Sequence, residues 1–239
     1  MITVAFLPVQ LPARGLVPDP GRVTSSHPFG ESLAFESTRG AAASSPLDAE
    51  TPLARLLAGN QRFVAGQPRY RHDVNAPAAR TAAHRPWALV IGCLDSRVPP
   101  EAVLDQDFGS IVVVRTGGHV LDEVGLGSVE FCVSVFGVPL IVVLGHQYCG
   151  AVSATVQAID SGDRPGGLIG RLVDEIEPAV DGDGDPAERV ERAVDRHIAR
   201  TVSKLSELAL IRERVASGAL EVIGARYQVD SGRVAILGR

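Results

Sequence analysis

Four short runs of apolar residues, separated by stretches of helical periodicity, dominate the chain after residue 86. They span residues 87–93, 110–116, 139–146 and 220–227, and are rich in valine, isoleucine and leucine. Strands buried on both faces of a parallel sheet have this composition. A fifth run, 233–238, follows the turn-like segment VDSG and predicts an antiparallel hairpin with the strand before it. We therefore predict an α/β fold with a mostly parallel central sheet of about four strands plus an antiparallel edge strand.

Helical periodicity fills the intervals between these runs, so helices are expected to flank the sheet. The best-marked helix has Asp185 as N-cap, Pro186 in its first turn and Gly218 beyond its end. The predicted helices are an N-terminal helical arm over residues 51–66, a helix over 124–137, one beginning near Cys149, and one over 186–216.

Residues 1–50 have a different character. They are rich in proline, glycine, serine and alanine and have no sustained period. Such a segment does not carry enough regular apolar surface to form a core, which predicts a weakly ordered N-terminal extension. The organisation expected is therefore an extension over 1–50 and a folded domain over 51–239.

Composition and charge exclude several classes of partner. The chain has 23 basic and 28 acidic residues, a net charge of −5, and 5% aromatic residues, which argues against nucleic acid as a partner. Its apolar runs are far shorter than the roughly 20 residues of a membrane helix, so no membrane partner is expected. Three cysteines are too few and odd in number for a disulfide framework, and the start lacks the basic region of a secretory signal. These features predict a cytoplasmic protein.

Two segments carry the candidate chemistry. Cys93–Arg97 (CLDSR) follows the first core strand, and His146–Gly150 (HQYCG) follows the third. Carboxyl ends of parallel strands meet at one edge of a sheet, where ligand sites form. Two thiols and an imidazole, from Cys93, His146 and Cys149, would suit Zn²⁺, and three protein ligands leave one position open, as in catalytic zinc sites.

Asp95 and Arg97 add a second function to the first segment. A carboxylate so close to a ligand cysteine could bind the metal itself and give a closed site. The guanidinium of Arg97 can hold Asp95 away by a bidentate ion pair, which leaves Asp95 free to accept a hydrogen bond from metal-bound water.

The two segments together resemble the β-class carbonic anhydrases, whose patterns are C-x-D-S-R and H-x-x-C-G. The resemblance implies zinc ligands at Cys93, His146 and Cys149 and a catalytic pair of Asp95 and Arg97. It also implies reversible hydration of carbon dioxide to bicarbonate and a proton by a zinc-bound hydroxide, in a homodimer or homotetramer. The resemblance covers roughly residues 51–239 and includes the segments 56–66, 112–120, 137–152 and 224–234.

The resemblance also assigns a substrate pocket. Backbone donors around Gly150 would steady an oxygen of the substrate, and Phe131 stands where an aromatic residue often lines the pocket. His84 stands where many members have a glutamine that donates to the substrate, so it either replaces that amide or is an ordinary loop residue. Residues 115–119 read RTGGH where many members have R-N-x-(A/G)-N. Val90 replaces the tryptophan of a secondary bicarbonate site found in some members, which argues against that site here.

The remaining candidates have simpler interpretations. Cys132 lies in an apolar helix and is expected to be a core thiol. His119 is more readily a loop histidine than a proton relay, and His197 belongs to no recognised group. Arg115 is expected to pair with a carboxylate or across an interface.

Two other functions fit the same residues. One is hydrolysis of a related small heterocumulene such as carbon disulfide. The other is a non-enzymatic zinc-holding interaction or sensor domain with Asp95 locked on the metal, a function that would leave Arg97 without a purpose.

Overall fold

The computed structural model describes residues 51–70, 84–182 and 184–238, and the elements below belong to this part of the chain. The predictions for residues 1–50 and for most of the 67–86 loop lie outside it. Five strands form one sheet: β1 (Ala88–Cys93), β2 (Ile111–Thr116), β3 (Leu140–His146), β4 (Glu221–Tyr227) and β5 (Val234–Leu237).

The sheet has the strand order β2-β1-β3-β4-β5. All neighbouring pairs are parallel except β4 and β5, which form the predicted antiparallel hairpin with Tyr227 opposite Val234. Strands β1 and β3 are buried along their whole length, whereas β2, at the edge, is half-buried over most of its length. The predicted α/β fold is confirmed.

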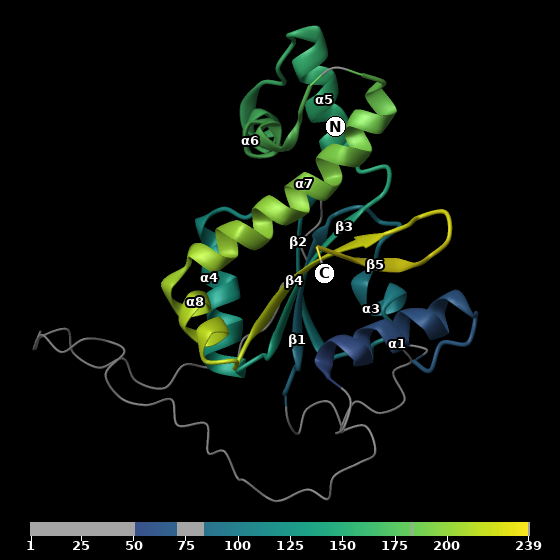
Figure 1. Ribbon diagram of the computed structural model, residues 1–239, viewed down its shortest axis with the longest axis vertical. Helices are drawn as coiled ribbons and strands as arrows, with labels where there is room; N and C mark the ends of the chain where they lie inside the picture. The colour runs from purple at the N-terminus through teal and green to yellow at the C-terminus, as the bar shows by residue number, and fades with distance from the viewer. Residues whose placement is uncertain (1–50, 71–83, 183, 239) are drawn as a thin grey trace, which may run out of the picture. The chain divides into compact units, whose positions relative to one another are not determined.

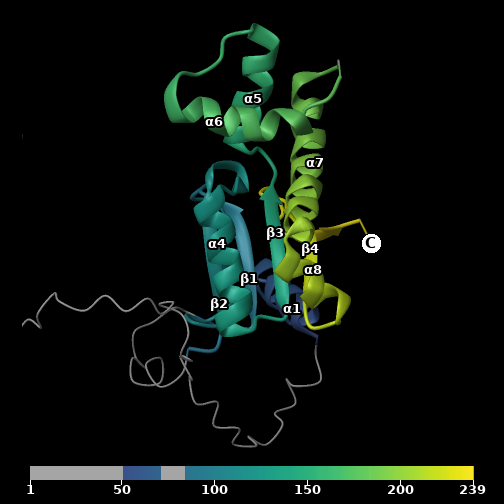
Figure 2. The ribbon, with the colours of Figure 1, turned by 90° about the vertical axis from the view of Figure 1, so that its left-hand side faces the viewer.

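Helices cover both faces of this sheet, as expected (Figures 1 and 2). Alternate residues of β1 point to opposite faces, so Leu89 and Ile91 pack with Cys93 among residues of α4, α5 and α7, whereas Val90 packs with α1 and α3. The helices are α1 (Pro52–Val64), α3 (Pro100–Val103), α4 (Glu123–Phe131, continued by a π-helical turn Cys132–Phe136), α5 (Gly150–Ser161), α6 (Gly167–Ile176), α7 (Pro186–Glu207) and α8 (Ala209–Ala216).

The long C-terminal helix begins as predicted but does not run on to residue 216. The Asp185 side chain accepts hydrogen bonds from the backbone N–H groups of Ala187 and Glu188 at 2.9 and 3.1 Å, which confirms the N-cap. At Leu208 the backbone is extended, with φ −63° and ψ 129°, and the helix stops. The prediction of one helix over 186–216 is therefore wrong: the amphipathic pattern continues through the break because Leu205 and Ile211 are both buried in the same core.

Within the described residues, no helix is both long enough and apolar enough to cross a bilayer.

Asn60 joins α1 to the rest of the fold. Its side-chain amide donates to the carbonyl oxygens of Val103 and Gly232 at 2.9 and 2.8 Å, and its oxygen accepts from the backbone N–H of Val234 at 2.8 Å. These partners lie at the end of α3 and in the β4–β5 hairpin, far apart in the sequence. A fully satisfied buried amide therefore anchors the predicted helical arm on its own chain.

We predict that Asn60→Ala lowers the free energy of unfolding by about 3 kcal/mol, because two carbonyls and one N–H lose their buried partner. The neighbouring Gln61 is exposed, so Gln61→Ala is the matched control and should change stability little. Urea unfolding followed by circular dichroism measures both. Equal stability of the two variants would contradict this role of Asn60.

Candidate metal centre

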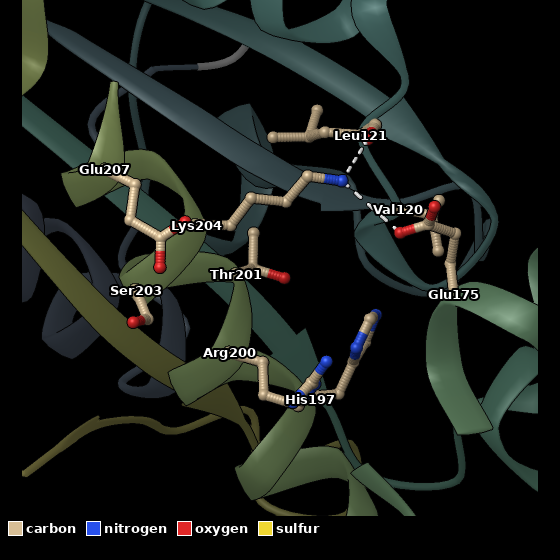
Figure 3. A pocket seen from close by; sticks show the side chains of 9 residues that line it. All are labelled: Val120, Leu121, Glu175, His197, Arg200, Thr201, Ser203, Lys204 and Glu207. Carbon is tan, nitrogen blue, oxygen red and sulfur yellow. Dashed lines mark hydrogen bonds and ion pairs between the residues drawn. The ribbon is translucent and has the colours of Figure 1, made fainter. Parts of the chain in front are cut away.

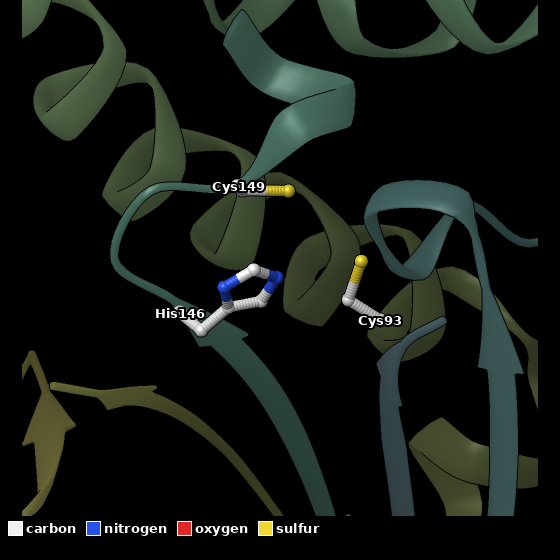
Figure 4. Close-up of side chains that lie close together, drawn as sticks. All are labelled: Cys93, His146 and Cys149. Carbon is white, nitrogen blue, oxygen red and sulfur yellow. The ribbon is translucent and has the colours of Figure 1, made fainter. Parts of the chain in front are cut away.

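The strand order brings the two predicted chemical segments together. Strands β2 and β3 lie on opposite sides of β1, so the sheet has a topological switch point between β1 and β3. Cys93 is the last residue of β1, His146 is the last residue of β3, and Cys149 is the N-cap of α5. Their ligand atoms, two sulfurs and a ring nitrogen, all lie within 4.8 Å of one another (Figure 4). The three predicted ligand residues thus meet in one buried cluster.

The orientation of His146 suits a metal ligand. Its Nδ1 lies 2.8 Å from the carbonyl oxygen of Gln147, which can only accept, so Nδ1 carries the proton. The bare Nε2 is buried and has no hydrogen-bond partner. In Figure 4 one ring nitrogen points toward the space between the two sulfurs. An acceptor buried without a partner is costly, and coordination of a cation would remove that cost.

The two thiols are unequal. The neighbouring Cys149 thiol and nearby backbone N–H groups lower the pKa of Cys93 against the opposing effect of burial. One of those groups is the N–H of Gly118, 3.3 Å from Cys93 Sγ. The resulting charge on Cys93, with burial, raises the pKa of Cys149. The two opposite pKa shifts mean that ionisation of one thiol opposes ionisation of the other, and a bound divalent cation would favour release of both protons.

Asp95 and Arg97 form the predicted bidentate pair. Arg97 donates from Nε to Oδ1 at 3.0 Å and from Nη2 to Oδ2 at 2.7 Å, and its Nη2 also donates to the carbonyl of Tyr148 at 3.2 Å. These bonds lower the pKa of Asp95 to about 2. Among the described residues, the cluster of ligand atoms includes no carboxylate. Asp95 is thus ionised and held off the cluster, as in the open arrangement.

Arg115 reaches the same segment from β2. It donates from Nε to the carbonyl of Cys93 at 2.8 Å and from Nη2 to the carbonyl of Asp95 at 2.6 Å. The expected carboxylate partner is therefore replaced by two backbone oxygens. Arg115 fixes the path of the chain between the first cysteine and the acid, which no spacing in the sequence indicates.

The proposed substrate residues are divided between two places. Gly150, the first residue of α5, directly follows Cys149, and a Cβ added at Gly150 would meet no atom within 4 Å. His84 and Phe131 instead gather on Phe136, at ring-centroid distances of 4.8 and 5.5 Å. Phe131 lines a groove of about 630 Å³ between α4 and β2. The structure brings Gly150 to the cluster and shows no contact of His84 or Phe131 with it.

Two buried histidines lie behind the cluster. The rings of His119 and His197 stack with centroids 4.4 Å apart, and Thr201 Oγ1 lies 3.3 Å from His119 Nδ1. Burial lowers the pKa of His197 to about 4 and holds the pKa of His119 well below its ordinary value, so both rings are neutral. No motif in the sequence includes His197. The one signal in the sequence is its position next to Ile198 on the apolar side of the helix, which indicates a buried histidine.

Cys132, by contrast, is the core thiol that was predicted. It is buried in the main core cluster, and burial raises its pKa. It takes no part in the metal centre.

Comparisons with known proteins agree on one family. A family model described as carbonic anhydrase matches residues 88–234. Carbonic anhydrase 2 of Mycobacterium tuberculosis is 45% identical over 184 residues, which cover 76% of this chain and 89% of that protein. The carbonic anhydrase of Mycolicibacterium smegmatis is 43% identical over 182 residues, covering 75% of this chain and 88% of that protein.

Solved structures show the same fold. One of two tetrameric β-carbonic anhydrases from Sordaria macrospora aligns with a TM-score of 0.63 and 24% identity over 77% of this chain and 95% of that one. The β-carbonic anhydrase CafA of Aspergillus fumigatus aligns with a TM-score of 0.61 and 25% identity over 77% and 90% of the two chains. The chain therefore belongs to the β class of the carbonic anhydrase family, which catalyses zinc-dependent hydration of carbon dioxide.

We predict that the buried, neutral state of His197 makes the protein less stable as the pH falls from 6.5 toward 4. In that interval the unfolded chain binds a proton at His197, whose ordinary pKa is 6.5, and the folded chain does not. His197→Gln lacks this group, so its stability loss between pH 7 and 5 should be smaller by about 2 kcal/mol. Urea unfolding of both proteins at the two pH values measures the difference, and parallel losses would contradict it.

Proposed function

We propose that residues 51–239 form a catalytic domain in which Cys93, His146 and Cys149 hold Zn²⁺ for the reversible hydration of carbon dioxide to bicarbonate and a proton. The observation that carries the proposal is the buried Nε2 of His146, left without a partner beside two thiols. Two sulfurs and one imidazole are ligands that zinc prefers, and three ligands leave a fourth position for chemistry.

Zinc, when bound, supplies a Lewis acid that lowers the pKa of a coordinated water to about 7. The protein's own contribution is a fixed set of donors. The Gln147 carbonyl sets the tautomer of His146, and the Gln147 N–H donates to the Tyr227 carbonyl at 3.0 Å. The loop that carries both His146 and Cys149 is therefore tied to β4 before any metal binds.

Arg97 and Asp95 control the open position. Both oxygens of Asp95 are engaged by Arg97, so Asp95 must break a bidentate ion pair before it can become a fourth ligand and close the site. While the pair persists, the ionised carboxylate can accept a hydrogen bond but cannot donate one. We propose that Asp95 orients the group that attacks carbon dioxide and that Arg97 is the residue that keeps Asp95 available for this task.

Gly150 is proposed to steady the substrate's oxygen. It begins α5, whose first N–H groups form a partly positive helix end. Gly150 is exposed, and a Cβ there would meet no atom within 4 Å, so its backbone can be approached from solvent. On the family resemblance, Phe131 is proposed to line the apolar pocket, and His84 is proposed either to replace the family's glutamine as a donor to the substrate or to be an ordinary loop residue. Both rings lie against Phe136 in this chain.

We also propose that the protein is a cytoplasmic homodimer or homotetramer. Among the strands that the structure describes, β2 forms the outer edge of the sheet, and the exposed Val124 and Phe131 flank the groove beside it. An uncovered strand edge next to apolar side chains is a common site of association. The three cysteines are free thiols, which fits a reducing compartment. The locked zinc domain is disfavoured because Asp95 is bound to Arg97 and stands apart from the cluster.

We predict that the purified full chain contains zinc and hydrates carbon dioxide in stopped-flow measurements. Asp95→Asn should retain zinc and lose about 100-fold or more in kcat/KM, because a misplaced attacking group can cost about that much in rate. Asp163 is an exposed carboxylate remote from these contacts, and Asp163→Asn is the control with unchanged activity. Cys149→Ala should lose zinc and activity together.

Three results would contradict this assignment. Full turnover in Asp95→Asn would remove Asp95 from the reaction. Full turnover in a zinc-free Cys149→Ala would remove the metal centre. Turnover of carbon disulfide by a zinc-loaded protein that leaves carbon dioxide unchanged would support heterocumulene hydrolysis in its place.

A further inference from the structure

The segment 117–121 lies between the metal centre and α7, and one of its residues, Gly118, contacts both. On one side the backbone N–H of Gly118 donates to Cys93 Sγ at 3.3 Å. On the other side its carbonyl oxygen lies 2.8 Å from Nε2 of His197. Gly118 has the left-handed values φ 59° and ψ 29°, and a Cβ there would lie 2.9 Å from Ile176 Cδ1. The backbone conformation of Gly118, which links its N–H to its carbonyl, is therefore confined by its neighbours.

Three residues of α7 hold this segment. His197 contacts the Gly118 carbonyl, Thr201 lies against His119, and the ammonium of Lys204 donates to the carbonyl of Leu121 at 2.9 Å. Spacings of four and three residues place these side chains on one face of a helix. Figure 3 shows the three side chains along α7 on the side that faces Val120 and Leu121.

The direction of the His197 hydrogen bond follows from its partner. A carbonyl oxygen accepts, so His197 donates from Nε2–H and its Nδ1 is bare. That Nδ1 is buried without a partner. The ring is 4% exposed and stacked on His119. A ring confined in this way presents its single N–H in one direction, toward Gly118.

We propose that His197 is a positioning residue of the metal centre: its Nε2–H holds the Gly118 carbonyl so that the Gly118 N–H stays on the sulfur of Cys93. The proposal rests on the proposed function in so far as Cys93 is a metal ligand. Hydrogen bonds to a coordinating group orient it and tune the electron density that it gives to the metal. His197 acts on Cys93 indirectly, through Gly118, and does not contact the sulfur itself.

The absence of this donor has a defined consequence. Without it the Gly118 carbonyl is left buried and unpaired, and the segment relaxes toward a new partner. The Gly118 N–H then leaves Cys93 Sγ. The sulfur loses the group that orients it, and this loss of orientation is the dominant effect on metal binding. Its lone pairs, no longer stabilised by an N–H, also rise in energy. Metal affinity should fall, and a transition from sulfur to a bound Co²⁺ ion should move to lower energy.

His197→Phe and His197→Gln separate these effects in the full chain. Phenylalanine keeps a flat ring against His119 and lacks the donor, whereas glutamine places an amide N–H near the position of Nε2. We expect the phenylalanine variant to bind zinc about 10-fold more weakly in chelator competition. The sulfur-to-Co²⁺ charge-transfer band of its cobalt form should move to longer wavelength. The glutamine variant should restore both properties.

Val194→Ala is the matched control for a purely structural effect. Val194 is 2% exposed on α7, one turn before His197, and packs in the core. Its variant should lose stability while keeping the wild-type zinc affinity and cobalt spectrum. His197→Leu serves as a second donor-free variant if the phenylalanine variant fails to fold.

Several outcomes would overturn the inference. These are wild-type affinity and spectrum in a donor-free variant, a glutamine variant as impaired as the phenylalanine variant, or a weakened metal site in Val194→Ala. If both donor-free variants fail to fold while the glutamine variant folds, His197 serves folding alone. Failure of the wild-type chain to bind zinc or cobalt would instead count against the proposed function, so the two failures are distinguishable.

Discussion

Two sulfurs and an unpartnered imidazole nitrogen, packed within 4.8 Å of one another in the interior, form the constraint on which the account depends. This cluster is unfavourable without a cation for two reasons. Charge on Cys93 raises the pKa of Cys149, and the bare Nε2 of His146 is buried with no donor to accept a hydrogen bond from. A divalent cation resolves both problems at once. Three protein ligands would leave a fourth position of a tetrahedral zinc ion free, as catalytic zinc sites do.

The rest of the centre serves to keep this cluster in place. Arg115 holds two carbonyls of the segment that carries Cys93, and Arg97 holds the carboxylate of Asp95. Gly118 supplies an N–H to Cys93 and is itself held by α7. Each of these groups comes from a different part of the chain. The parallel sheet makes this possible, since the carboxyl ends of its strands deliver distant segments to one edge.

The features that were predictable from the sequence are those with a local signal. Continuous apolar runs marked β1 to β4, Asp185 marked the start of α7, and the two short motifs marked the Cys93–His146–Cys149 cluster and the Asp95–Arg97 pair.

The features that were missed depend on tertiary contacts. The break at Leu208 leaves the apolar pattern of the helix unchanged, the partners of Arg115 are backbone atoms, and the role of His197 depends on a glycine 79 residues away. The placement of His84 and Phe131 around Phe136 likewise follows from packing that no motif records. Local sequence patterns were therefore enough to locate the site, whereas the contacts that hold its residues in place are visible only in the folded structure.

X-ray absorption at the zinc edge of the zinc-loaded full chain tests the central claim most directly. The account predicts two sulfur neighbours at about 2.3 Å and nitrogen or oxygen neighbours at about 2.0–2.1 Å. It also predicts that Cys149→Ala removes a sulfur neighbour or abolishes binding. A zinc ion with fewer than two sulfur neighbours in the wild-type protein, or a sulfur count that Cys149→Ala leaves unchanged, would contradict it.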